Sequence, residues 1–134
     1  MNLLVDTGVF SASLSRRRRP ELESLVARIK GNQLLLTVQT VAELRFGALQ
    51  ADWGGVRRAR LEAAIASTTV VPVTDALVTE VAALRLACRS IGHPLADRVH
   101  ANDLWIAATA VHLDAPLLSA DRVFDQTPHV RLLR

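Results

Sequence analysis

Short aliphatic runs alternate along this chain with longer stretches in which apolar residues recur every three or four positions. The short runs predict β-strands, and the longer patterns predict amphipathic helices. Strands that alternate with helices indicate βαβ units, a parallel sheet and right-handed crossovers. The pattern therefore predicts an α/β fold, with helices flanking a central parallel sheet of about five strands. The expected strands are 2–5, 33–37, 69–73, 116–121 and 130–133.

The helical patterns have recognisable ends and inner faces. Pro20 stands near the start of the first pattern and Gly31 just past its end, as is typical of helix boundaries. The longest pattern, 75–92, places apolar residues that include Val78 and Ile91 on its inner face. The expected helices are 20–30, 38–49, 55–67, 75–92 and 102–113.

One proline indicates the order of the strands. Pro72 lies in the third expected strand, and a strand that lacks an N–H donor is confined to a sheet edge. With that strand at the edge, the order 3-2-1-4-5 follows as a plausible topology. Strands one and four would then flank the point at which the strand order reverses, and ligands bind beyond the carboxyl ends of the strands at such a point.

The first strand runs into Asp6, Thr7 and Gly8, the letters of an aspartic protease loop. A homodimeric protease would use Asp6 as one half of a shared dyad. That class is nearly all-β, and its catalytic loop follows an earlier hairpin, for which the five residues before Asp6 leave no room. The protease is therefore a remote alternative, and Thr7 and Gly8 are interpreted as a turn that leaves the first strand.

Four acids fall at the carboxyl end of the predicted sheet. Asp6 directly follows the first strand, and Asp121 follows the fourth. Glu43 lies in the first turns of the helix after the second strand. Asp103 comes after Asn102, the expected N-cap of the nearly all-apolar helix. We therefore expect four carboxylates from four segments to converge on one site.

Each acid alone also has a plain structural explanation. Asp6 and Asp121 would cap the turns that follow them, and Asp103 would complement a helix dipole. That explanation fits the four together poorly, because the segments around them are apolar and clustered acids repel one another unless protons or cations compensate. A site made of carboxylate oxygens favours Mg²⁺ or Mn²⁺ over Zn²⁺.

Four segments resemble, in order and spacing, the acidic motifs of PIN-domain ribonucleases: LLVDTGVF, TVAELRFGAL, NDLWIAATA and LLSADRVF. The strongest resemblance is to the VapC-type toxins of bacterial type II toxin–antitoxin systems. It covers essentially the whole chain, and it implies a single PIN domain, 1–134, with a PIN-like three-layer fold. It also implies that the catalytic and metal-binding acids are Asp6, Glu43, Asp103 and Asp121.

Further positions match the family pattern, and one departs from it. Thr7 and Ser119 match hydroxyl positions beside the first and fourth acids, and Asn102 matches the polar residue before the third. The family usually has Asn or Ser two residues after the first aspartate, where this chain has Gly8. A hydrogen bond to the acid cluster is then missing or replaced by water, although no ligand is lost.

The resemblance implies metal-dependent hydrolysis of RNA. One or two Mg²⁺ or Mn²⁺ ions, held chiefly by Asp6, Asp103 and Asp121, would lower the pKa of a water that attacks phosphorus in line. Glu43 would either complete the metal shell or hold that water. The family further implies a homodimer and a cognate VapB-type antitoxin that covers the active site. The alternative is a non-catalytic PIN-like domain that binds RNA or has a regulatory role.

The net charge is +3, and arginine supplies nearly all of the positive charge. Guanidinium groups suit bidentate phosphate contacts, so a polyanionic partner is expected. A basic run after the first acid is expected either to edge the crevice and contact RNA phosphates or to be a solvated loop. It consists of Arg16, Arg17, Arg18 and Arg19.

The aromatic residues, histidines and single cysteine lead to further expectations about burial and cellular compartment. Phe46 and Trp105 are expected in the core and Trp53 at the surface, and the four histidines are expected in surface or loop positions. Cys88 is alone, which favours a reducing, cytoplasmic setting. The longest apolar run is far shorter than the ~20 residues that cross a bilayer, and no signal peptide is recognisable, so no membrane association is expected.

Overall fold

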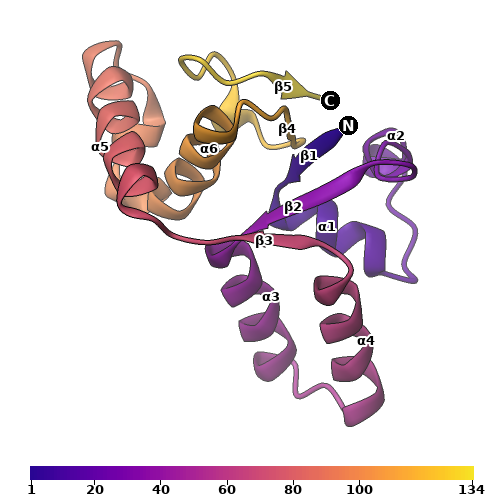
Figure 1. The fold of residues 1–134 in the computed structure, drawn as a ribbon. Helices are drawn as coiled ribbons and strands as arrows, with labels where there is room; N and C mark the ends of the chain where they lie inside the picture. The colour runs from indigo at the N-terminus through magenta and orange to yellow at the C-terminus, as the bar shows by residue number, and fades with distance from the viewer.

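A computed structural model describes residues 1–134 and shows a five-stranded sheet in which every neighbouring pair is parallel (Figure 1). The strand order is β3-β2-β1-β4-β5, which confirms the predicted α/β class and the order 3-2-1-4-5. The strands are β1 (Asn2–Val5), β2 (Gln33–Thr37), β3 (Thr69–Val71), β4 (Leu117–Leu118) and β5 (Leu132–Leu133).

Six α-helices and four short 3₁₀ turns connect the strands. The helices are α1 (Thr7–Leu14), α2 (Glu23–Ala27), α3 (Val38–Gln50), α4 (Gly55–Ala66), α5 (Asp75–Ser90) and α6 (Ala101–Leu113). The 3₁₀ turns are η1 (Pro20–Leu22), η2 (Pro94–Ala96), η3 (Arg98–His100) and η4 (Arg122–Phe124). None of the helices combines the length and apolarity that crossing a bilayer requires.

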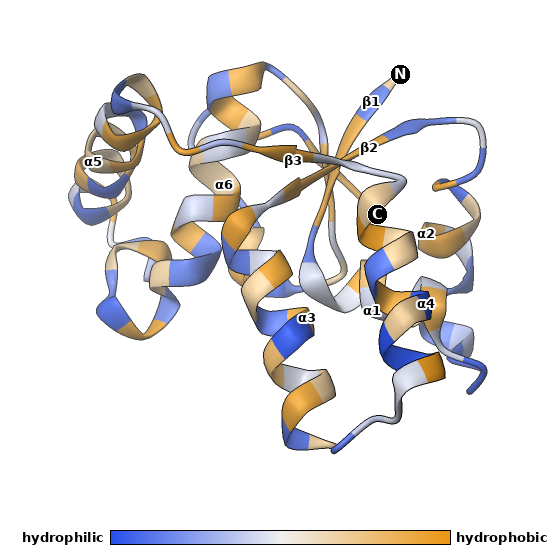
Figure 2. Cartoon of the chain, turned by 60° about the horizontal axis from the view of Figure 1, so that its bottom comes forward, coloured by the Kyte–Doolittle hydropathy of each residue, from blue (hydrophilic) through white to orange (hydrophobic).

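The sheet is covered on both faces, because successive side chains of a strand point to opposite sides. Leu3 and Val5 of β1 pack into one hydrophobic core with residues of α1, α2, α3 and α4. Leu4 packs into a second core with residues of α5 and α6. All three side chains are at most 1% exposed. The fold therefore has three layers, and α4 and α5 carry both hydrophobic and hydrophilic side chains, as Figure 2 shows.

The turn expected at Thr7 and Gly8 is wrong, because a helix begins there. Asp6 is the N-cap of α1, and its Oδ1 accepts a hydrogen bond of 2.9 Å from the N–H of Val9. The helix expected from residue 20 is also shorter than predicted. It starts as the η1 turn, ends as α2 at Ala27, and is followed by turns that reach Gly31 in the left-handed region.

Three expectations about burial are also wrong. Val78 and Ile91 of the α5 region are 46% and 62% exposed, and Phe46 of α3 is 62% exposed. The packed stripe of α5 is narrower than its apolar pattern because α6 is its main helical neighbour. Trp105 is half-buried against the core of α5 and α6.

The N-cap expected at Asn102 is also wrong, since α6 already begins one residue earlier, at Ala101.

His93 is buried rather than placed at the surface. Its Nδ1 accepts a hydrogen bond of 3.1 Å from the N–H of Leu95, so the proton of the neutral ring lies on Nε2. Nε2 donates to the carbonyl of Asp125 at 2.8 Å. The imidazole thereby joins η2 to the end of η4, and η4 follows directly on Asp121.

Candidate active site

The first and fourth acids meet where β1 and β4 end side by side. Val5 pairs with Leu118 in the sheet, and the next residues of the two strands are Asp6 and Ser119. The fully buried hydroxyl of Ser119 donates a short hydrogen bond to Oδ2 of Asp6. The Oγ atom of Ser119 also accepts a hydrogen bond of 3.0 Å from the backbone N–H of Asp121. One buried hydroxyl therefore links the segments that carry the two acids.

Asp6 is buried and bound by two hydrogen bonds. Its side chain is only 7% exposed and accepts hydrogen bonds from Ser119 and from the Val9 backbone. Burial raises the pKa of Asp6 above its ordinary value, and the charge of Asp121 raises it further. The two hydrogen bonds act in the opposite direction because they stabilise the carboxylate. Asp6 thus serves both as a helix cap and as a member of the acid group.

Asp103 connects the remaining acids electrostatically. It lies half-buried in the first turn of α6, and burial is the main cause that raises its pKa. The charges of Asp121, Glu43 and Asp6 raise it further, in that order. His100 opposes them, since its Nδ1 lies 3.7 Å from Oδ2 of Asp103. Asp6, Glu43 and Asp121 are therefore all close enough to act on Asp103 at the carboxyl end of the sheet.

Glu43 and Thr7 have different neighbours within this group. Oε1 of Glu43 accepts a hydrogen bond of 3.4 Å from the side-chain amide of Asn102, and Oε2 has no protein partner. The hydroxyl of Thr7 donates at 3.0 Å to Thr40 rather than to an acid. Thr40 in turn bonds to Thr37, the N-cap of α3. Thr7 therefore ties α1 to α3, which carries Glu43.

The chemistry of the donor group fits a hard divalent cation. Its donors are carboxylate oxygens, and among the charges that act on Asp103 only that of His100 offsets their repulsion. In this structure no three His, Cys, Asp or Glu side chains stand close enough to ligate one ion together. Holding an ion would therefore require these side chains to turn inward from their present positions.

Replacing Asp103 with Asn should raise the melting temperature of the metal-free protein by roughly 2 °C at neutral pH. Because the pKa of Asp103 is higher in the folded protein than in the unfolded chain, its ionised form destabilises the fold. The benefit of a negative charge in the first turn of α6, about 0.3–1 kcal/mol, opposes this effect, so the expected gain is small. Thermal denaturation in EDTA, with the variant compared to wild type, measures the difference.

The same experiment at several pH values tests the cause. The difference should be full above the raised pKa of Asp103 and should shrink as the pH falls through it, because the wild-type side chain then takes up a proton. Asp97→Asn, at an exposed position, is the control and should show no such pH-dependent gain. A lower melting temperature for Asp103→Asn at neutral pH would contradict the proposed repulsion.

The family model of the PIN domain matches residues 3–130, nearly the whole chain. This chain belongs to the PIN domain family. It is 34% identical to Ribonuclease VapC5 of Mycobacterium tuberculosis over 136 residues, which cover 98% of this chain and 93% of that protein.

Solved structures agree with this PIN domain in fold. A member of the VapBC family of toxin–antitoxin systems, VapBC-5 from Mycobacterium tuberculosis, matches with a TM-score of 0.68 and 31% identity, covering 99% of this chain and 98% of that one. FitAcB from Neisseria gonorrhoeae matches with a TM-score of 0.80 at 22% identity, over 98% and 96% of the two chains. The second likeness concerns the fold alone.

The glycine that departs from the family pattern leaves the acids in place. Gly8 lies in the first turn of α1, and a Cβ built on it would stand 3.8 Å from Oδ1 of Asp6. A polar side chain at this position would therefore lie beside Asp6, whereas glycine leaves that side open. The two hydrogen bonds that Asp6 accepts come from elsewhere in the PIN domain, so they do not depend on residue 8.

The basic run of the PIN domain divides into two pairs. Arg18 forms an ion pair with Glu23, and Arg19 forms one with Glu21, 3.3 Å long. The other two arginines, Arg16 and Arg17, have no carboxylate partner and line a cleft that also includes Glu43. The sequence alone could not separate the pairs, because all four arginines are adjacent and exposed.

Proposed function

We propose that this PIN domain is a metal-dependent endoribonuclease toxin of the VapC type, which hydrolyses RNA phosphodiester bonds. The observation that carries the proposal is that Asp6, Glu43 and Asp121 all act on the half-buried carboxyl group of Asp103. Such a concentration of acids destabilises the fold, and a bound cation would offset the repulsion among them. The relative named Ribonuclease VapC5 supports RNA as the substrate.

Asp6, Asp103 and Asp121 would hold Mg²⁺ or Mn²⁺, with Glu43 beside them. Bound there, the ion would acidify a water and offset the negative charge that develops on the phosphate and the leaving oxygen. The protein has few cations of its own at this place, since His100 is the only basic group that acts on Asp103. The four acids therefore need the ion in order to admit a phosphate.

The other residues of the site orient these acids. Ser119 fixes the Oδ2 atom of Asp6 and the backbone of Asp121 at once. Asn102 holds Oε1 of Glu43, which leaves Oε2 free to accept a hydrogen bond from a water or to complete the ligand set. Both roles of Glu43 are compatible with its half-buried position on α3.

A cognate VapB-type antitoxin and a second copy of this chain are the proposed protein partners. Support for the antitoxin comes from VapBC-5, a toxin–antitoxin system whose structure matches this chain at 31% identity. The antitoxin would neutralise the toxin by covering the acids. The homodimer is proposed from the resemblance to the VapC type.

The decisive experiment incubates the purified protein with RNA in Mg²⁺, in Mn²⁺ and in EDTA, and follows the fragments on a gel. We expect cleavage with either metal and none in EDTA, because without a cation the four carboxylates repel the phosphate. RNA that is bound but stays intact with both metals would support a non-catalytic PIN-like domain instead. Peptide hydrolysis that is indifferent to EDTA would revive the aspartic protease.

A further inference from the structure

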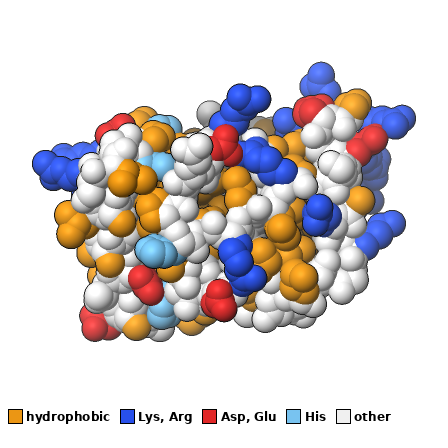
Figure 3. Space-filling model, turned by 90° about the horizontal axis from the view of Figure 1, so that it is seen from above, with side chains coloured by type: hydrophobic (Ala, Val, Ile, Leu, Met, Phe, Trp, Pro, Cys, Tyr) orange, Lys and Arg blue, Asp and Glu red, His pale blue; other side chains and the backbone are white.

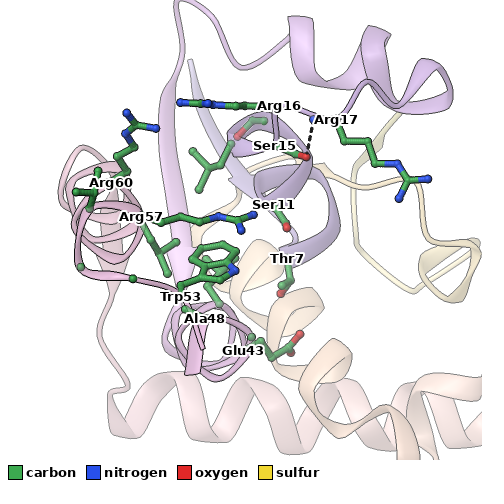
Figure 4. A pocket seen from close by; sticks show the side chains of 18 residues that line it. Thr7, Ser11, Ser15, Arg16, Arg17, Glu43, Ala48, Trp53, Arg57 and Arg60 are labelled. Atoms are coloured by element: carbon green, nitrogen blue, oxygen red, sulfur yellow. Dashed lines mark hydrogen bonds between the residues drawn. The ribbon is translucent and has the colours of Figure 1, made fainter. Parts of the chain in front are cut away.

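A cleft of about 1120 Å³ extends from the acid group between α1, α3 and α4 (Figure 4). Thr7 and Glu43 line its inner end. The hydroxyls of Thr7, Ser11 and Ser15 follow one another at four-residue spacing along α1 and its C-cap, over roughly 12 Å. A ligand that lies in the cleft would therefore pass a row of hydroxyl groups on its way to the carboxylates.

Four arginines that line this cleft have no side-chain hydrogen bond or ion pair with the protein. Two precede α2 and two belong to α4, and they are Arg16, Arg17, Arg57 and Arg60. Other arginines nearby are neutralised, such as Arg45 of α3, which forms an ion pair of 2.7 Å with Glu62. Figure 3 shows the opposite face, seen from above, where Lys and Arg side chains lie mainly on the side of the molecule away from α5. The cleft thus offers unpaired positive charge to a polyanion.

Arg57 is held in a defined plane by an aromatic ring. Its guanidinium carbon lies 3.9 Å from the ring centroid of Trp53, an attractive cation–π arrangement. Trp53 is half-buried and packs against the core beneath α3 and α4, so the indole is an anchored support. In Figure 4, Arg57 extends over Trp53 toward Ser11. A planar, oriented guanidinium is a group on which an unstacked nucleobase can stack.

We propose that this cleft is a subsite for single-stranded RNA, in which Arg57, supported by Trp53, stacks on a base. Arg16, Arg17 and Arg60 bind the phosphates that lead toward the carboxylates. Single-stranded RNA fits because its bases can turn outward and stack, whereas the bases of a duplex stay paired inside the helix. This inference rests on the proposed ribonuclease function and names the form of RNA that the site accepts.

Fluorescence anisotropy with a labelled single-stranded RNA tests the subsite. Asp103→Asn protein in Mg²⁺ serves as the background, so that bound RNA stays intact. Arg57→Ala should weaken binding about tenfold, as expected when one stacking contact is lost. Arg57→Lys should lose most of the same affinity, because it keeps the charge but not the planar group. Arg58→Ala is the control on the same helix, outside the cleft, and should bind as the parent does.

The dependence of binding on salt separates the two kinds of contact. Arg60→Ala should lower the slope of log affinity against log salt by about 0.7, the value for one phosphate contact of a single strand. Arg57→Lys should leave the slope unchanged. A second measurement leaves the cleft intact: in Trp105→Phe protein, RNA should quench the fluorescence of Trp53, the tryptophan that remains.

The outcomes distinguish this inference from the proposed function. If the Arg57 and Arg60 variants bind RNA as the control does, the subsite is overturned even though RNA is cleaved. If those variants lose binding while the wild-type protein cleaves no RNA with either metal, the subsite stands and the nuclease proposal fails. Binding of poly-glutamate at Trp53 without binding of single-stranded RNA, or equal binding of a duplex, would also overturn the inference.

Discussion

Asp6→Asn should slow the cleavage of RNA about a thousandfold while leaving the protein folded. The substitution removes one of the charges that would hold the cation, and the charge stabilisation that such an ion supplies is worth several kcal/mol. The fold should survive because the amide oxygen of Asn can still accept the N–H of Val9, and Asn is as good an N-cap as Asp. Ser119 can turn its hydroxyl to accept the new N–H group.

Initial rates on a labelled RNA, with circular dichroism as a check on folding, measure the effect. Asp114→Asn makes the same chemical change far from the acids, at a left-handed residue after α6 where Asn is well tolerated. This control should cleave at the wild-type rate. Expression of the wild-type chain without an antitoxin should arrest growth, and Asp6→Asn should relieve the arrest. Full cleavage by a folded Asp6→Asn protein would remove Asp6 from the site.

The sheet could be predicted from the sequence because its signals are strong and local. Aliphatic runs mark each strand, and Pro72 follows β3 at the sheet edge, where the missing N–H costs no ladder bond. The helix that follows β1 could not be predicted, since TGVFSASL combines glycine with small polar residues and has weak helical signals. Asp6 starts α1 through its side chain, a contact that the order of apolar residues does not show.

Errors about burial have a different cause. An apolar stripe on α5 or α3 shows that a helix is amphipathic, but the width of the covered strip depends on the neighbours that pack against it. Phe46 and Val78 lie at the margins of such stripes and are exposed. His93 shows the reverse error, since a polar residue is buried where the N–H of nearby Leu95 and the carbonyl of distant Asp125 satisfy both ring nitrogens.

In the candidate site, the positions of the acids could be predicted from the sequence, but the contacts that orient them could not. The placing of Asp6 and Asp121 follows from topology, since adjacent strands end at one edge of the sheet. The contacts that orient the acids could not be predicted, because they join segments far apart in the chain. Ser119 reaches Asp6 across 113 positions, and Thr7 reaches Thr40 across 33. The pairing of Arg57 with Trp53 is local, spaced at four residues, and a search for Arg in the first turn of a helix near a preceding aromatic residue could have found it.

Ser119→Ala should slow RNA cleavage roughly 10- to 100-fold, the usual cost of removing a partner that orients a metal ligand. The hydroxyl donates to Asp6 and accepts from the backbone of Asp121, so its loss frees both acids. It should also change the pH dependence. The hydrogen bond from Ser119 lowers the pKa of Asp6, and without it that pKa rises further above its ordinary value. The acid side of the rate profile should therefore move to higher pH, since Asp6 must be ionised to hold a cation.

A merely structural role of Ser119 would not move that profile, and a matched variant separates the two cases. Thr109→Val also removes a fully buried hydroxyl, but the partner of this hydroxyl is the carbonyl of Trp105 in its own helix, 2.7 Å away. Both variants should lose some stability in urea, whereas only Ser119→Ala should lose activity and shift the pH–rate profile. If the two variants show equal rates and the same profile, the hydroxyl of Ser119 does not orient the acids, and the link between Asp6 and Asp121 is only part of the fold.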